Sequence, residues 1–208
     1  MPTRNPRQKP KNKLSRQMGE NIWGKDNCPT NNRTYGPGQH GPKGVRRRSD
    51  YGVQLREKQK LKGYYGNIGE KQFRNIYKEA YATKGDTSEN LLIFLESRLD
   101  AIIYRSNIVP TVFAARQFVN HKHVTVNGIV VNIASFRCKP GDLIEVNEKS
   151  KTIPLVLESI QNMARDVPEY ISLNTKELKV SYIRYPSSDE IPYATVMSPA
   201  SVVEFYSR

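Results

Sequence analysis

The chain has 208 residues, a formal net charge of +13 and only two cysteines, Cys28 and Cys138. Neither cysteine has another cysteine or a histidine at metal-ligand spacing, so the sequence predicts no zinc site. No apolar run reaches membrane-spanning length, and the N-terminal residues lack the apolar core of a signal peptide. We therefore expect a cytoplasmic protein with two free thiols and no membrane contact.

The positive charge is unevenly distributed along the chain. Residues 1–62 hold 16 Lys and Arg against 4 Asp and Glu, whereas residues 63–89 balance at 4 against 4. Residues 90–140 hold 6 Lys and Arg against 2 Asp and Glu, and residues 141–208 carry a net negative charge. A segregated positive field of this kind attracts polyanions, of which nucleic acid is the most common.

Residues 1–45 are predicted to form a basic, extended N-terminal arm. They hold 6 of the 13 prolines and 6 of the 13 glycines but few apolar residues. Such a segment cannot bury enough apolar surface to offset its ordering entropy, so we expect it to become ordered against a polyanion. A basic run follows directly, made of Arg46, Arg47 and Arg48.

Helices are predicted over residues 50–66 and 70–85. Asp50 is the expected N-cap of the first helix, and glycines stand near its end. In the second helix the apolar residues recur at helical spacing, and Gly85 is a natural stop.

The clearest helix is predicted over residues 86–107, because Asp86 and Glu89 have capping-box spacing and the leucines that follow form one stripe. Arg98 and Arg105 are seven positions apart and are expected along one edge of that stripe, on a basic side left free.

A shorter helix is predicted after Thr111, with Arg116 and Gln117 on its polar side. The apolar period then changes to two, and Asn127-Gly128 is typical of a two-residue hairpin turn because both positions take a positive φ. The alternating apolar residues of the two hairpin strands are Val124, Val126, Ile129, Val131 and Ile133.

Beyond the hairpin, a strand is predicted over residues 143–146 and a helix over residues 154–165. The residues expected to face inward from this helix are Leu157, Ile160 and Ala164. Residues 178–185 and 201–206 are predicted as short strands or extended segments.

Two of the three histidines, His121 and His123, stand where the shorter helix meets the hairpin. A metal site would need a third ligand, and the only other histidine, His40, lies in the arm. A catalytic site would need an orienting partner, and no carboxylate stands beside these histidines. A third interpretation is that they are polar residues that end the helix.

The segment around these histidines is basic. Residues 90–140 contain only two acids, Glu96 and Asp100. Arginine binds phosphate through paired donors, while lysine and histidine add single donors. We therefore expect a phosphate-binding surface, and RNA rather than DNA, because no predicted helix looks free to fill a major groove.

Residues 98–146, "RLDAIIYRSNIVPTVFAARQFVNHKHVTVNGIVVNIASFRCKPGDLIEV", closely resemble the RNA-binding module of the fourth small-subunit ribosomal protein family. The match extends beyond this module. "PGQHG" at residues 37–41, "SDYGVQLREKQKLKGYYG" at 49–66 and "VVEFYSR" at 202–208 also resemble bacterial members of the family. The resemblance therefore covers nearly the whole chain in order.

The resemblance implies an α+β fold in which a mainly helical body domain carries an inserted module of two helices packed on a small antiparallel sheet. The arm would cover residues 1–45 and the module residues 96–158. The body would comprise residues 46–95 and be completed by residues 159–208.

For function, the resemblance implies a non-enzymatic structural protein of the small ribosomal subunit, without a cofactor. Members of the family bind small-subunit ribosomal RNA at a multi-helix junction and nucleate assembly of the subunit body. They contact the fifth small-subunit protein, which bears on decoding accuracy, and lie near the channel through which messenger RNA enters. The positions expected to contact RNA are Arg46, Arg47, Arg48, Arg98, Arg105, Thr111, Arg116, Gln117, His121, Lys122, His123, Asn127 and Arg137.

The arm departs from the pattern of many relatives, which carry a four-cysteine metal knuckle there. This region has only Cys28. The resemblance then implies an arm that is ordered by RNA contacts rather than by a metal ion.

Two other classes of protein carry the same module: RNA-modifying enzymes or a tRNA synthetase, and ribosome-rescue proteins. An enzyme should add a catalytic domain, but the remainder here is an arm, a few helices and a short tail. "YGPGQHGPKG" at residues 35–44 is interrupted by prolines and follows no predicted strand, so it is not a nucleotide-binding loop. The matches outside the module argue against a rescue protein built from the module alone.

Overall fold

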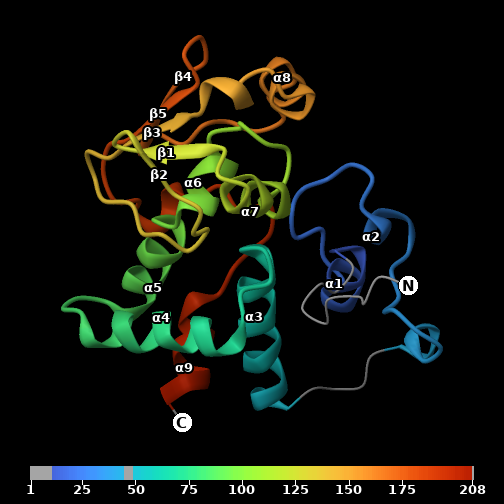
Figure 1. The fold of residues 1–208 in the computed structure, drawn as a ribbon. Helices are drawn as coiled ribbons and strands as arrows, with labels where there is room; N and C mark the ends of the chain where they lie inside the picture. Colours follow the sequence, from blue (N-terminus) through green and yellow to red (C-terminus); the bar gives the residue numbers. More distant parts are fainter. Residues whose placement is uncertain (1–10, 45–48, 208) are drawn as a thin grey trace, which may run out of the picture. The chain divides into compact units, whose positions relative to one another are not determined.

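The computed structural model describes residues 11–44 and 49–207, and the chain forms two compact units. The first unit comprises Met1–Ser88 and Tyr193–Arg208, and the second comprises Glu89–Pro192 (Figure 1). The expected mixed α+β class is confirmed, because helices and one antiparallel sheet are both present. No helix within the described ranges is long and apolar enough to cross a membrane.

The first unit is built around three helices. They are α3 (Asp50–Tyr64), α4 (Glu70–Ala82) and α9 (Pro199–Ser207). Helix α9 packs along α3 (Figure 1). The ring of Tyr206 on α9 stacks on Tyr77 of α4, with centroids 4.7 Å apart. These contacts close a small helical core whose centre includes the fully buried Phe73.

The predicted bounds of α3 and α4 are close to the observed ones, but the N-cap of α3 was assigned wrongly. Ser49 is the N-cap, and its side chain accepts a hydrogen bond from the backbone N–H of Gly52 at 3.3 Å. Asp50 is the first helical residue, where its negative charge complements the helix dipole.

The N-terminal arm is not extended over residues 11–44. This segment contains α1 (Lys11–Met18), α2 (Pro29–Asn32) and the short 3-10 helix η1 (Gly41–Lys43), and α1 packs on α3. Its few apolar residues are concentrated, and Met18 and Ile22 are buried. Trp23 Nε1 donates to the carbonyl of Tyr64 at 3.2 Å. The prediction of an extended arm was wrong because a few apolar residues of this segment are buried and α1 packs against α3.

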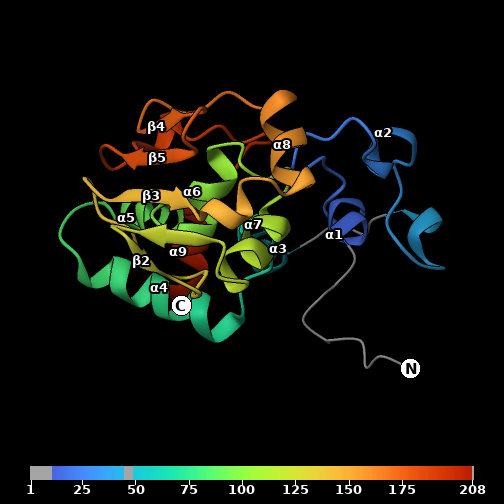
Figure 2. The same cartoon turned by 45° about the horizontal axis from the view of Figure 1, so that its top comes forward.

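The second unit contains a five-stranded antiparallel sheet in the order β2-β1-β3-β5-β4. The strands are β1 (Val124–Val126), β2 (Ile129–Val130), β3 (Leu143–Val146), β4 (Ile171–Asn174) and β5 (Lys179–Tyr182). Its helices are α5 (Thr87–Glu96), which begins at the unit boundary, α6 (Leu99–Arg105), α7 (Val112–Asn120) and α8 (Pro154–Gln161), with the 3-10 helices η2 (Glu148–Ser150) and η3 (Ser188–Glu190). Helices α6 and α7 pack together beside the sheet in both views (Figures 1 and 2).

The helix predicted over residues 86–107 is two helices in the structure. The chain is extended at Arg98, which forms an isolated antiparallel bridge with Arg137. The backbone N–H of Leu99 donates to the carbonyl of Phe136 at 2.8 Å, and the N–H of Cys138 donates to the carbonyl of Ser97 at 2.8 Å. Hydrogen bonds to a distant segment thus replace the helical ones at the break.

The hairpin forms at Asn127-Gly128 as predicted, but its return strand is shorter. Strand β2 has two residues and lies at the edge of the sheet. Ile129 on β2 and Ile133 beyond it are both exposed, and β2 has no partner on its outer side among the described strands.

Two predictions near the C-terminus were wrong. Helix α8 buries Val156 and Ser159 rather than Leu157, which is 47% exposed. Ser159 turns inward because its hydroxyl donates to the carbonyl of Asn107 at 2.6 Å. Helix α9 occupies the segment expected to be extended at 201–206, where the apolar residues pack on α3.

The return from the second unit to the first lies at Pro192 and Tyr193, not at residue 159. Strand β5 pairs with β3, in a register that places Val180 opposite Ile144, and β4 pairs with β5. Residues 159–192 therefore complete the sheet that the hairpin begins. Strand β4 alternates apolar and polar residues over only four positions, and no strand was predicted there.

Candidate nucleic-acid interface

Helix α7 presents one apolar and one polar side, as predicted. Val112 and Ala115 are buried, while Gln117 is exposed and Arg116 is partly exposed. Thr111 is the N-cap, and its hydroxyl accepts a hydrogen bond from the backbone N–H of Ala114 at 3.0 Å. Its side chain therefore positions the helix.

The chain leaves α7 through a tight turn that exposes His121 and Lys122. His121 is the C-cap, and Lys122 has a φ of 63°, in the left-handed region. The side-chain amide of Asn147 donates to the carbonyl of Lys122 at 2.6 Å. The backbone N–H of Asn147 donates to the carbonyl of His123 at 3.0 Å. The turn is thus held by a residue that follows β3.

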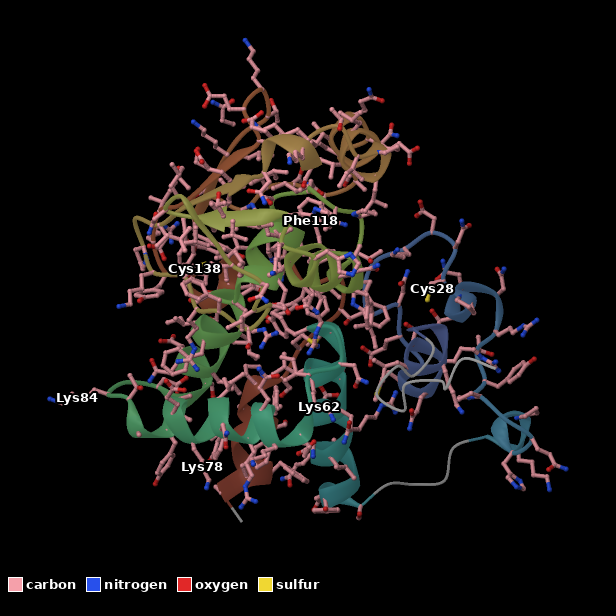
Figure 3. All side chains as sticks on the ribbon, in the orientation of Figure 1. Cys28, Lys62, Lys78, Lys84, Phe118 and Cys138 are labelled. Atoms are coloured by element: carbon pink, nitrogen blue, oxygen red, sulfur yellow. The ribbon has the colours of Figure 1, made fainter. Side chains whose placement is uncertain are left out.

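The His123 side chain is held in place rather than free. Its Nδ1 lies 2.8 Å from the hydroxyl of Ser150, and its ring packs 4.8 Å from the ring of Phe118, which Figure 3 labels. Burial lowers the pKa of His123, and the nearby His121 lowers it further. Neutral His123 can accept or donate a single hydrogen bond here.

Asn127 is exposed at the hairpin turn, but its side chain serves the fold. Asn127 has a φ of 50° and Gly128 a φ of 80°, as the turn requires. The amide of Asn127 donates to Asp142 at 2.9 Å, and its carbonyl oxygen accepts from the backbone N–H of Leu143 at 2.9 Å. The turn is thereby fixed to the start of β3.

Arg98 and Arg105 do not lie on a free basic side, and this prediction was wrong. They are only 1% and 3% exposed. Arg98 donates to both carboxylate oxygens of Asp100, at 2.9 and 2.5 Å. Arg105 donates to both oxygens of Glu96, at 3.0 and 2.6 Å. The break at Arg98 turns both guanidinium groups toward acids of the unit's interior.

The remaining predicted positions have different environments. The Arg137 guanidinium lies over the ring of Phe94, 4.3 Å from its centroid, and is partly exposed. Arg46, Arg47 and Arg48 lie outside the described residues.

The structure therefore gathers a smaller set of polar and cationic groups at the end of α7 and the turn before β1. Its members are Arg116, Gln117, His121, Lys122 and His123. We call this set the α7–β1 surface. Its supports Asn147 and Ser150 were not predicted from the sequence, because neither has a local signal that links it to a turn more than twenty positions earlier.

The metal and catalytic interpretations of the histidines gain no support from the geometry. The rings of His121 and His123 are 5.9 Å apart. Within residues 11–44 and 49–207, no three His, Cys, Asp or Glu side chains are grouped to hold a metal ion. Cys138 is buried, and burial, followed by Asp142 and Asp100, raises its pKa to about 12.

Comparison of the sequence with known proteins matches it to two family models and to several relatives. A family model described as "Ribosomal protein S4/S9 N-terminal domain" matches residues 7–96, and one described as "S4 domain" matches residues 97–144. Small ribosomal subunit protein uS4 of Bartonella quintana (strain Toulouse) is 60% identical over 202 residues, covering 97% of this chain and 98% of the relative. The protein of the same name from Rhizobium meliloti (strain 1021) has the same identity and coverage.

The chain belongs to the uS4 family. The resemblance found in the sequence is thereby confirmed, and a uS4 protein is a structural component of the small ribosomal subunit rather than an enzyme. The S4 domain contains every member of the α7–β1 surface. It ends within β3, so the supports Asn147 and Ser150 lie beyond it.

Proposed function

We propose that this uS4 chain binds small-subunit ribosomal RNA directly and works within the ribosome in the bacterial cytoplasm. The observation that carries the proposal is the α7–β1 surface. Gln117 is exposed on α7, and His121 and Lys122 are exposed on the turn that follows, which distant residues hold rigid. A rigid set of donors loses little conformational freedom when it binds phosphate or base edges.

The contacts divide into direct and supporting roles. Arg116, Gln117, His121 and Lys122 are proposed as direct contacts, since their side chains reach the surface. His123 and Arg137 are partly exposed and are proposed as contacts at its margin. The positions proposed to act through the fold are Arg98, Arg105, Thr111 and Asn127.

The finer functions rest on the family resemblance. They are binding at a multi-helix junction, nucleation of subunit assembly, contact with the fifth small-subunit protein that affects accuracy, and proximity to messenger RNA where it enters. The run Arg46, Arg47 and Arg48 is proposed for the messenger contact. The match over nearly the whole chain favours this function over an RNA-modifying or ribosome-rescue protein.

Footprinting on naked small-subunit ribosomal RNA, with excess tRNA as competitor, tests the proposal. We expect one localised footprint, and an affinity that falls steeply with salt because phosphate binding releases counterions. Arg116→Ala and Lys122→Ala should each weaken binding and reduce the salt slope by about one. The matched control is Lys176→Ala, an exposed lysine in the acidic C-terminal block.

Diffuse protection that tRNA removes would contradict direct, specific binding. A localised footprint with equal effects of Arg116→Ala and Lys176→Ala would keep rRNA binding but reject the α7–β1 surface as its site.

A further inference from the structure

Helix α4 in the first unit has a basic outer face. Lys71, Arg74 and Lys78 are spaced at i, i+3 and i+7, so they lie on one side of the helix. All three are exposed, whereas Phe73 and Ile76 of the same helix are buried. We call the three cations the α4 basic face.

Glu70, the acid that precedes this face on α4, does not neutralise it. The carboxylate of Glu70 forms ion pairs with two lysines of α3, Lys58 at 2.7 Å and Lys62 at 3.3 Å. In the parts of the chain that the structure describes, Lys71, Arg74 and Lys78 make no ion pair. The balanced charge count of residues 63–89 therefore conceals a local positive surface. Figure 3 shows the side chain of Lys78 pointing away from α4, and that of Lys84 pointing outward beyond the end of this helix.

An exposed aromatic ring extends this face toward the end of α4. Tyr81 is three positions after Lys78 and is 69% exposed. Its ring stacks on Tyr77, with centroids 6.3 Å apart and planes at 29°, and Tyr77 stacks in turn on Tyr206. The buried end of this row orients Tyr81 while its ring remains largely open to solvent.

We propose that the α4 basic face and Tyr81 form a second RNA-contact site, separate from the α7–β1 surface. Lys71, Arg74 and Lys78 bind backbone phosphates, and an unpaired base stacks on Tyr81. Cations that track phosphate beside an exposed aromatic platform are the combination by which proteins hold single-stranded nucleic acid. This inference rests on the proposed binding of ribosomal RNA and assigns it a second surface.

The test uses the full chain and naked small-subunit ribosomal RNA. The variant K71Q/R74Q/K78Q keeps good helix formers at exposed positions, so its thermal unfolding should be unchanged. We expect its salt slope to fall by about one for each lost cation, and one segment of the wild-type footprint to disappear. The control K176Q/K179Q/R184Q removes the same charge from the second unit.

Tyr81 is tested separately because stacking does not depend on charge. Tyr81→Ala should weaken binding about tenfold, whereas Tyr81→Phe should bind like the wild type. Ultraviolet irradiation of the wild-type complex should produce a base crosslink at Tyr81, located by mass spectrometry.

The outcomes separate this inference from the proposed function. Wild-type binding with equal losses in the two triple variants would overturn the α4 site but leave ribosomal RNA binding intact. The α4 site is also overturned if K71Q/R74Q/K78Q keeps the complete footprint. If the wild type gives no localised footprint, the proposed function fails, and this inference fails with it.

Discussion

The guanidinium group of Arg105 and the carboxylate of Glu96 form a buried, two-point ion pair, with distances of 2.6 and 3.0 Å. The hydroxyl of Tyr170 also donates to Glu96, at 3.0 Å, and Arg105 donates to the carbonyl of Pro192 at 3.0 Å. The pair thus connects α5 and α6 to the segments that precede β4 and end the second unit. Both charges are buried and bind each other, so Arg105 contributes to the fold rather than to an exposed basic surface.

Glu96→Gln should strongly destabilise the second unit, because it leaves the Arg105 charge buried without a counterion. Breaking a buried pair in this way costs about 3–5 kcal/mol of unfolding free energy. Thermal and urea unfolding, followed by circular dichroism, would measure the loss. Glu158→Gln on the exposed side of α8 is the control and should stay within about 0.5 kcal/mol of the wild type.

The double variant Glu96→Leu/Arg105→Met should be more stable than Glu96→Gln, because it removes both charges. If Glu96→Gln and the double variant both unfolded like the wild type, the ion pair would not stabilise the fold. Arg105 would then be available again as an RNA contact.

We expect the lowered pKa of His123 to reduce the free energy of unfolding in mild acid. Burial lowers its folded pKa below the ordinary 6.5, so the unfolded chain binds the proton more readily. The stabilisation is therefore complete above about pH 6.5 and is lost as the pH falls through the folded pKa. Urea unfolding between about pH 7.5 and 5.5 should show this slope, and His123→Gln should flatten it.

The control for this prediction is His40→Gln, which changes an exposed histidine of the first unit. An NMR titration of His123 would give its folded pKa directly. A value at or above 6.5 would contradict the prediction.

We expect the ion pairs of Glu70 to stabilise the first unit at neutral pH and to lose this effect at lower pH. Partial burial alone would raise its pKa, but hydrogen bonds from Lys58, Tyr206 and Lys62 outweigh burial and lower it to about 2. Its stabilisation is present above pH 4.5 and is lost as the pH falls toward 2.

Glu70→Gln should therefore unfold at a lower temperature than the wild type at neutral pH, with a difference that shrinks below about pH 4.5. Differential scanning calorimetry across this range measures it. Glu204→Gln, an exposed change on α9, should show no such convergence. A constant difference for Glu70→Gln at every pH would argue against the assigned pKa.

Cys138 should resist alkylation in the folded protein. Its thiol is 2% exposed, and burial, followed by Asp142 and Asp100, raises its pKa to about 12. The thiolate that reacts with iodoacetamide is therefore scarce and inaccessible. In a Cys28→Ser background, mass spectrometry should find Cys138 unlabelled until denaturant is added. Labelling at the rate of a free thiol would contradict the structure.

Local sequence signals predicted the elements whose cause is local. Asn127-Gly128 requires positive φ angles, and the hairpin turns there. Thr111 caps α7, and the strand at 143–146 has the predicted bounds. The polar side of α7 also followed from its period, so part of the α7–β1 surface was predictable.

The sequence by itself determined the hairpin, because Asn127-Gly128 requires positive φ angles at both positions. The α+β class and the RNA-binding module were expected from the sequence through its resemblance to a known family. Tertiary structure alone decided that Arg98 and Arg105 are buried, because Asp100 and Glu96 reach them only after the chain breaks at Arg98. It also decided that α4 has a basic face, since Glu70 is neutralised from α3. A charge count cannot distinguish a paired cation from an unpaired one, because pairing depends on which distant side chain folding brings within reach.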